Sequence, residues 1–574
     1  NILSISDMLG DTYTREFDLL GRLKDIDHPD LGELAYTYSA ADDILSTTEA
    51  DGFHIWSDRD TIGRCYRTRY ERDSSVSNYT YDAPSVANSL GLMTSRQNAQ
   101  ARWGAKSFDP LGNCLEDTVS IAGVSIQSVM RYEYDESSRQ TTIRFVGGEG
   151  FHNDYEYYPG SSLVRESRAE SVSDLVALKV SDYSAFGRPG RLEYYHNDET
   201  APFITVDYTL SEADDRIYGI LARNQGSDGQ PQNDLLNRSY SYSAAGDLLA
   251  MIDYKKGDIL NKPNNEYVYT YQYDERHRLR KVFEAGSTSP AIETKYDAGG
   301  RITEKKFGTR KLMYQYTGSR PHAVSGLVVG TSTYSVAYDQ RGNTTSDVGL
   351  ESILSPINRA FNYGPENRVD LVTYGPPGVP EPSEVTFAYG PDGMRVRKSV
   401  TGGLSTFYYN PYFELDNYVD GSNYDRLKYV FFGRQRIMQR GPTGTQVLIS
   451  DMLGSVNLTC DTTGQPVYSV DYDAWGKPKD AAGTGYQKWQ YTGQEREQGF
   501  QLYNYNAREY DPARGTFLAP DAIDQNLCDP QMLNRYGYAR GNPEKYTDAS
   551  GVIIGELLDI GFVVMDVQSM VSNI

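Results

Sequence analysis

The side chains best suited to chemistry in this sequence are carboxylates near its C-terminal end. Glu509, Asp511 and Asp521 lie within a short stretch that also holds Arg508. Two carboxyl groups placed close together share a proton because both cannot ionise cheaply, so one can act as a base while the other stays a protonated acid. The same residues also fit a structural role. Asp511 and Asp521 each adjoin a proline and can cap turns, with Arg508 in an ion pair.

Other catalytic or metal-binding patterns are not found in the sequence. Neither the histidines nor the cysteines have the spacing of metal ligands, and no CxxC pair is present. The glycine-rich stretch 147–150 lacks the Lys-Ser/Thr of a phosphate loop and is typical of a hairpin turn. We therefore expect no metal and no cofactor. The residues considered are His28, His54, His152, His196, His277, His322, Cys65, Cys114, Cys460 and Cys528.

The composition points to a repetitive β structure. The chain has 574 residues, too many for one ordinary single-core domain, with 48 Tyr and 53 Gly. Such a bias is typical of many short strands joined by glycine-containing turns. The net charge of −22 argues against a nucleic-acid partner, because phosphate binding needs clustered Lys and Arg.

A repeating unit is visible from the start of the chain. Phe17-Asp18-Leu19-Leu20-Gly21-Arg22 recurs in register at Tyr38-Ser39, Arg59-Asp60 and Tyr81-Asp82, at steps of 21, 21 and 22 residues. Each unit predicts a strand ending on the aromatic residue, a turn capped by Asp with Gly at positive φ, and a return strand. Copies side by side would build a curving sheet. A sandwich or a propeller is disfavoured, since a propeller blade needs about 40 residues or more.

Further motifs follow in order towards the C-terminal end. They include Arg320-Pro321-His322-Ala323-Val324, Tyr472-Asp473-Ala474-Trp475-Gly476 and the run from Leu502 to Asp521. With the repeats, these motifs resemble RHS/YD-repeat proteins. The resemblance implies an all-β fold, in which YD-repeat β-hairpins at 1–400 spiral into a hollow shell, a cocoon. The repeat-associated core at 401–552 plugs the shell, and 553–574 forms a short helical tail that begins an effector or a linker.

What the resemblance implies for function is a shell that encloses a C-terminal effector and releases it by aspartyl autoproteolysis. Bacterial polymorphic toxins and the C components of insecticidal Tc toxin complexes share this pattern. Arg508 matches the family's core arginine and Asp521 its catalytic aspartate. The second acid is left open between Glu509, which directly follows the arginine, and Asp511.

Family members are cut just after a short Asp-Pro-x-Gly-aliphatic sequence. The matching residues here are 548–552, with Ala549 in place of the proline, so the expected scissile bond joins Val552 to Ile553. Gly551 is expected to let the backbone lie extended. The sequence also changes at this point from the Tyr/Gly pattern to a mostly aliphatic run, in which Glu556, Asp559 and Asp566 form one stripe of a predicted helix and disfavour a transmembrane span.

The expected partners follow from the same resemblance. They are the chain's own C-terminal effector as cargo and a secretion or Tc-type translocation component, with the protein secreted or delivered outside the producing cell. The alternative is a teneurin-like adhesion or recognition shell without proteolysis. The pair Arg508 and Asp521, with the change in composition at Val552, favours the toxin shell.

Overall fold

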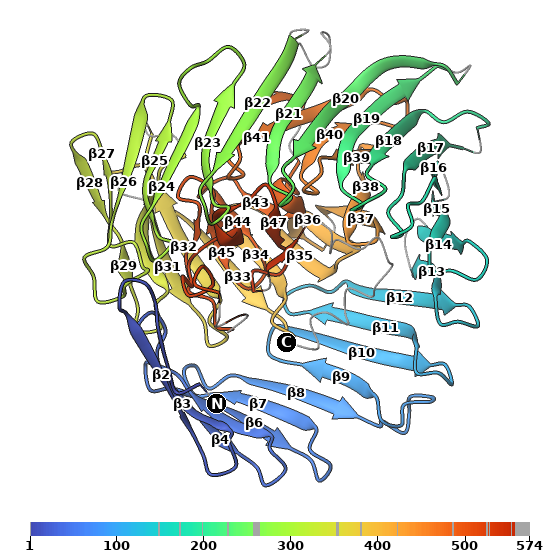
Figure 1. The fold of residues 1–574 in the computed structure, drawn as a ribbon. Coiled ribbons are helices and arrows are strands. Elements are labelled where there is room, and N and C mark those ends of the chain that lie inside the picture. Colours follow the sequence, from blue (N-terminus) through green and yellow to red (C-terminus); the bar gives the residue numbers. More distant parts are fainter. Residues whose placement is uncertain are drawn as a thin grey trace.

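The computed structural model describes residues 2–146, 150–171, 174–197, 199–226, 229–255, 265–351, 355–378, 382–421, 423–484, 487–523, 526, 529–552 and 554–556. Over these residues the chain is built almost entirely of antiparallel strands, each paired with the next along the sequence. The strands curve round in an incomplete ring, which we call the wall (Figure 1). The predicted all-β shell of hairpins is confirmed.

The first wall sheet has 28 strands within the described residues. It runs through β1 Ser4–Ser6, β2 Thr12–Phe17, β3 Leu23–His28, β4 Gly32–Tyr38, β5 Ile44–Thr48, β6 His54–Arg59, β7 Cys65–Tyr70, β8 Val76–Tyr81, β9 Met93–Gln97, β10 Ala101–Phe108, β11 Cys114–Ile121, β12 Gln127–Tyr134, β13 Gln140–Phe145, β14 His152–Tyr157, β15 Val164–Ser171, β16 Asp174–Ser181, β17 Arg191–His196, β18 Ile204–Leu210, β19 Ile217–Gln225, β20 Pro231–Tyr242, β21 Leu248–Lys255, β22 Asn265–Tyr273, β23 Leu279–Glu284, β24 Ile292–Tyr296, β25 Ile302–Phe307, β26 Arg310–Gln315, β27 Gly326–Val329 and β28 Ser332–Ser335.

A second wall sheet of 14 strands continues the spiral. The sequence boundary expected at residue 400 falls between two of its paired strands, β34 and β35, and the last wall strand ends at Gly483. The strands are β29 Ala337–Tyr338, β30 Thr344–Gly349, β31 Ile357–Tyr363, β32 Val369–Gly375, β33 Ser383–Tyr389, β34 Arg395–Val400, β35 Ser405–Asn410, β36 Phe413–Asp420, β37 Asn423–Phe432, β38 Gln435–Gly441, β39 Gly444–Ser450, β40 Val456–Cys460, β41 Pro466–Tyr472 and β42 Pro478–Gly483.

The hairpin turns have the predicted chemistry. In the first unit Asp18 Oδ1 accepts hydrogen bonds from the backbone N–H groups of Leu20 and Arg22, at 2.9 and 3.0 Å. Gly21 has φ 82° and donates its N–H to the carbonyl of Asp18. An L side chain rarely adopts that φ, which is why glycine ends the turn.

Arginine and tyrosine join one unit to the next. The guanidinium of Arg22 lies 4.7 Å from the ring centroid of Tyr38, and the tyrosine hydroxyl donates to the carbonyl of Leu23. Arg64 over Tyr81 repeats this stacking at 4.5 Å. Each unit therefore packs on the aromatic residue of its successor, with a cation–π contribution, and this explains the unusual tyrosine content.

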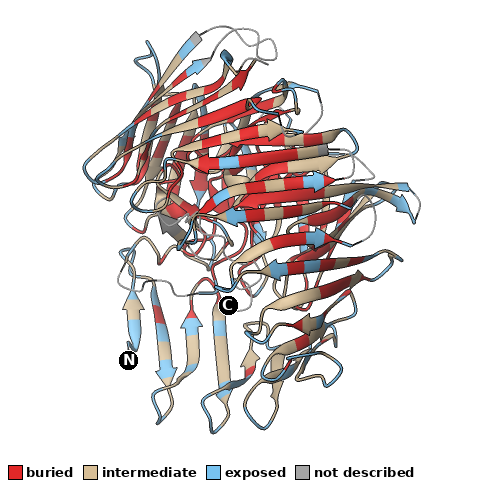
Figure 2. Cartoon of the chain, turned by 90° about the vertical axis from the view of Figure 1, so that its right-hand side faces the viewer, coloured by how far each residue is buried: buried red, intermediate tan, exposed pale blue. Residues whose placement is uncertain are grey.

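Burial is lower in the first strands of the wall than in many of the later ones. All six residues of β6 are half-buried, whereas all five residues of β40 are buried. Figure 2 shows the same trend, with buried residues gathered in the middle strands and exposed or intermediate ones near the N-terminal end. The largest cluster of buried apolar side chains reaches from Ala101 in the wall to Ala539.

The segment after the wall folds inside its curve, where it fills the centre of the ring (Figure 1). We call residues 487–556 the core. Its elements are short: the 3-10 helix η1 Tyr491–Gly493, β43 Glu495–Glu497, β44 Leu502–Asn504, β45 Glu509–Asp511, β46 Thr516–Phe517, the 3-10 helix η2 Ala539–Gly541, β47 Tyr546–Asp548 and β48 Ile554–Glu556. The tail expected to be helical thus begins as a strand at 554–556, and residues 557–574 lie outside the described part of the chain.

Candidate functional site

Buried aromatic rings hold the loops that carry the candidate acids. Tyr505, Tyr510, Phe517 and Tyr538 are fully buried and pack on one another, with ring centroids 4.2 to 5.7 Å apart. Strands β44, β45 and β46 pair in order, so the residues that join them are held against this cluster. Arg508 lies in the loop between β44 and β45.

Arg508 is the centre of the site. One of its terminal nitrogens lies 3.0 Å from Oδ2 of Asp521 and 3.2 Å from Oδ2 of Asp548. Its Nε donates to the carbonyl of Gly551, and its guanidinium lies 3.8 Å from the ring centroid of Phe517. All three charged side chains are buried, so one arginine holds two carboxyl groups and the backbone just before Val552.

Asp548 ends β47 and caps the turn that contains the expected cleavage sequence. Its Oδ1 accepts from the N–H of Ser550 and of Val552, at 3.3 and 3.0 Å. Burial raises the pKa of Asp548, and the nearby Asp521 adds to this rise, against the opposing effect of Arg508. Asp548 is thus a buried carboxyl group beside a second acid, and burial disfavours its ionised form.

Glu509 follows Arg508 directly, yet its side chain lies in a different cluster. Its Oε1 accepts from Arg395 of β34 at 2.9 Å, and the same arginine binds Glu495 and Glu497 of β43 at 3.3 and 2.6 Å. Burial raises the pKa of Glu509 to about 8, and the two neighbouring glutamates add to it. Glu509 therefore belongs to a buried charge cluster with the wall rather than to the contacts of Arg508.

Asp511 joins the core to the wall. Its Oδ2 lies 2.6 Å from Arg359 of β31, and its Oδ1 accepts from the N–H of Arg514 at 3.0 Å. Burial alone would raise the pKa of Asp511, but Arg359 and Arg514 outweigh it and hold the pKa below its usual range. These contacts match the structural role that the sequence left open for this residue.

The expected cleavage site lies in the loop between β47 and β48. These strands pair Asp548 with Ile554, so the chain reverses direction between these two residues. Gly551 has φ 74°, so the expectation of an extended backbone there is wrong. A Cβ on Gly551 would also meet the carbonyl oxygen of Tyr505 at 2.6 Å. Val552 is half-buried, and Ile553 lies outside the described residues.

The structure thus brings Arg508 and Asp521 together and places Glu509 and Asp511 elsewhere. Asp548 also contacts Arg508, and the sequence analysis considered this residue only as part of the expected cleavage sequence. Its position two residues before Ser550 and its Asp-x-x-Gly pattern are those of a turn cap, and the side chain does cap this turn. Among the described residues no cluster of His, Cys, Asp and Glu could hold a metal ion, and no helix is long and apolar enough to cross a membrane.

The wall and the core together define an RHS-repeat shell, as the sequence motifs predicted. The chain resembles the crystal structure of TcdB2-TccC3-Cdc42 with a TM-score of 0.74 at 17% identity, over 96% of this chain and 29% of that one. It also resembles the Photorhabdus luminescens Tc holotoxin pore, with a TM-score of 0.73 at 16% identity, over 96% of this chain and 29% of that one.

Two curated relatives are similar in sequence. The tRNA3(Ser)-specific nuclease WapA of Bacillus spizizenii and the tRNA nuclease WapA of Bacillus subtilis are each 25% identical to this chain over 303 residues. Each match covers 50% of this chain and 12% of the relative. The chain therefore spans a small part of these proteins. No family model matches the sequence.

Proposed function

We propose that this chain is the shell of a polymorphic toxin, which encloses a C-terminal effector and cuts it free at the bond between Val552 and Ile553. The fold resembles that of a structure named as a Tc holotoxin pore, and the sequence resembles part of proteins named as tRNA nucleases, so both similarities support a shell that serves a toxic activity. The effector of this chain would follow Val552 and be its cargo. We further propose delivery outside the producing cell through a secretion or Tc-type component.

The observation that carries the proteolysis is the meeting of Asp521 and Asp548 on Arg508. In the proposed reaction the oxygen of a water molecule attacks the carbonyl carbon of Val552 while the Asp521 carboxylate takes a proton from that water. Protonated Asp548 donates a hydrogen bond to the carbonyl oxygen and stabilises the charge that develops there. The C–N bond then breaks, Asp521 passes the proton taken from water to the departing amine of Ile553, and Val552 ends in a carboxyl group.

Arg508 has a positioning role in this scheme. It holds one carboxylate oxygen of each acid and, through Nε, the carbonyl of Gly551 next to the reacting residue. A shared cation lowers the free energy of bringing two carboxyl groups together in a buried place. The site would act once on its own chain, because the substrate is part of the same hairpin as Asp548.

The test is the mass of the fragments from a chain that continues beyond Ile574. Wild-type protein is expected to give a shell fragment that ends at Val552, and Asp521→Asn is expected to stay whole while the strand content measured by circular dichroism is unchanged. The matched control is Asp473→Asn, which changes a turn-capping aspartate outside the site. An uncut wild-type chain would contradict the proteolysis and leave the adhesion shell as the better explanation.

A further inference from the structure

The candidate site is connected to the N-terminal end of the chain through Arg535. The carbonyl oxygen of Arg535 accepts from Arg508 at 3.1 Å and from the N–H of Asp521 at 3.0 Å. Its guanidinium donates to the carbonyl of Asp521 at 3.5 Å and to that of Ile523. Arg535 is 4% exposed, so both halves of this residue are fixed by packing. Arg535 thus contacts both Arg508 and Asp521.

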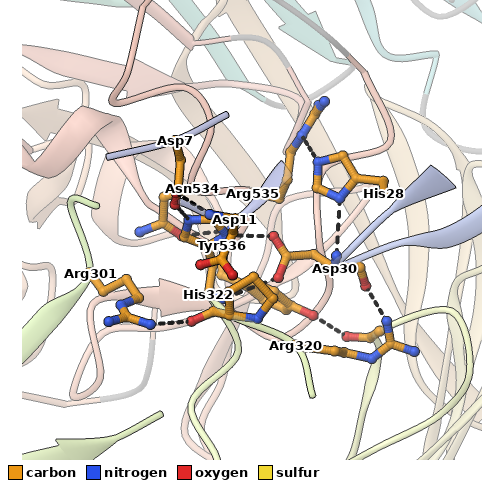
Figure 3. A network of polar contacts seen from close by, with 12 residues as sticks. Asp7, Asp11, His28, Asp30, Arg301, Arg320, His322, Asn534, Arg535 and Tyr536 are labelled. Atoms are coloured by element: carbon orange, nitrogen blue, oxygen red, sulfur yellow. Dashed lines mark hydrogen bonds and ion pairs between the residues drawn. The ribbon is translucent and has the colours of Figure 1, made fainter. Parts of the chain in front are cut away.

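The guanidinium of Arg535 packs against His28 at the end of β3, more than 500 residues earlier in the chain (Figure 3). The nitrogens Nε of Arg535 and Nε2 of His28 are 3.4 Å apart. Nδ1 of His28 accepts from the N–H of Asp30 at 3.0 Å, and a neutral imidazole has one acceptor and one donor nitrogen. We therefore interpret the approach to Arg535 as a packing contact. Burial lowers the pKa of His28 to about 4, so the ring is neutral beside the guanidinium near neutral pH.

A clamp around His322 holds the N-terminal loops in place. Its Nδ1 lies 2.7 Å from Oδ2 of Asp30 and its Nε2 lies 3.0 Å from Oδ2 of Asp7, and all three side chains are buried (Figure 3). Arg320 donates to the carbonyl of Asp30 at 2.6 Å. Burial alone would lower the pKa of His322, but the two aspartates outweigh it and raise the pKa. The loops after β1 and β3 are thus bound to the wall segment that follows β26.

The N-terminal loop also lies close to Gly342, which in turn lies close to the residue before the candidate catalytic acid. A Cβ built on Gly342 would lie 2.3 Å from the carbonyl oxygen of Asp30, 2.9 Å from the hydroxyl of Tyr536 and 3.1 Å from Cγ of Pro520. Gly342 is therefore the point where the N-terminal loop, the second wall sheet and the core meet. Two distant parts of the chain meet here, since Asp30 and His322 are almost 300 residues apart in sequence.

We propose that Arg535 is a positioning residue for the Arg508 and Asp521 site, and that docking of the N-terminal loops through His28 and Asp30 sets its position. This inference rests on the proposed self-cleavage and adds a regulation to it. In a chain whose N-terminal strands are not yet docked, His28 does not pack against Arg535. The carbonyl of Arg535, which accepts from Arg508, is then no longer held in place. Cleavage then follows closure of the shell, and the effector is released only inside it.

The experiment compares His28→Ala with His28→Asn in the full chain during cell-free synthesis, with timed samples on denaturing gels. Alanine leaves a gap beside Arg535, and a displacement of about 1 Å at a reacting site is enough to slow a reaction by about 10²-fold. We expect cleavage in His28→Ala to be slower by tenfold or more, on the order of that estimate. The amide oxygen of His28→Asn can still accept from the N–H of Asp30, and should restore much of the rate.

The control is His54→Ala. His54 begins β6 in the same sheet, where its Nδ1 lies 2.9 Å from Oγ1 of Thr48 and its ring stacks on Trp56. This variant loses a comparable ring from the N-terminal strands and should be cut at the wild-type rate. If His54→Ala and His28→Ala slow cleavage equally, the effect reflects general loss of wall stability and the proposal is wrong.

Hydrogen exchange separates this inference from the proposed function. The N–H of Asp521 bonds to the carbonyl of Arg535, so its exchange reports the position of Arg535 without any cleavage. In His28→Ala it should exchange faster than in wild type, and in His28→Asn close to wild type. An uncut wild-type chain would overturn the self-cleavage, whereas unchanged exchange and unchanged cleavage in His28→Ala would overturn the coupling. If His28→Ala does not fold, Asp30→Asn, which weakens the His322 clamp at constant shape, is expected to change both readouts in the same direction.

Discussion

Replacing Asp548 by asparagine is the sharpest test of the paired acids. Asparagine keeps the shape of the side chain, and its Oδ1 can still accept from the N–H of Val552, which now lies 3.0 Å from Oδ1 of Asp548. An asparagine cannot ionise or carry an acidic proton, so it cannot take the role that the proposed reaction gives Asp548. Loss of one acid–base partner typically slows a reaction by about 10²- to 10⁴-fold, and we expect a loss in that range.

The stability of the chain should change little in this variant. Arg508 keeps its contacts with Asp521, with the carbonyl of Gly551 and with the carbonyl of Arg535. One hydrogen bond makes a net contribution of about 1 kcal/mol to stability, so the free energy of unfolding should change by about that amount or less. A large loss of cleavage with a small change in stability would separate chemistry from folding.

The assay is timed cleavage of a chain that extends beyond the described residues, with chemical unfolding of the same samples. Glu509→Gln and Asp511→Asn are the matched controls, because each changes a neighbouring acid whose described ion pair is with an arginine other than Arg508. The reasoning is refuted if Asp548→Asn is cut as fast as wild type. It is refuted equally if a folded Glu509→Gln chain stays uncut.

Three further predictions concern stability. Gly342→Ala should lower the free energy of unfolding by more than about 1 kcal/mol, because φ is 85° and its Cβ would meet the carbonyl oxygen of Asp30; Gly10→Ala, with φ 89° and open space, should lose less in the same urea titration. The folded-state pKa of Glu509, about 8, lies above its ordinary value, so its contribution is present at low pH and is lost as pH rises towards 8. The free energy of unfolding should therefore fall by up to about 1.4 kcal/mol per pH unit between the ordinary pKa of a glutamate and pH 8, and Glu509→Gln should remove this fall. An unchanged pH profile in the variant would contradict the raised pKa. Arg395→Met leaves three buried glutamates without their arginine and should destabilise the chain by about 3–5 kcal/mol, measured by thermal and chemical unfolding; a neutral result would show that these glutamates are protonated.

The wall depends on contacts that repeat in the sequence, whereas the core depends on contacts that do not. Lys305 of β25 illustrates the second kind, since its Nζ donates to the carbonyls of Pro512 and Ala513 and lies 4.5 Å from the ring centroid of Trp475. Burial lowers the pKa of Lys305 to about 7. The hydrogen bonds of this buried lysine to backbone carbonyls fix the position of the core against the wall.

The hairpin wall could be derived from the sequence because its signals are local. Asp18 and Gly21 specify a turn within four residues, and the 21-residue step places Arg22 beside Tyr38. The order of strands follows, since each hairpin pairs with its neighbour. Arg508 and Asp521 were also found from sequence, because both lie within one short motif of the core.

The partner acid and the connection to the N-terminal loops arise only from tertiary folding. Asp548 is 40 residues from Arg508, and its neighbours in sequence give it the pattern of a turn cap. Glu509 and Asp511 were both left open as the second acid because they lie close to Arg508 in sequence, but their side chains contact Arg395 and Arg359 of the wall. His28 reaches Arg535 because the spiral returns on itself, and the curvature that brings two such residues together is a sum of many small strand twists that no local motif encodes.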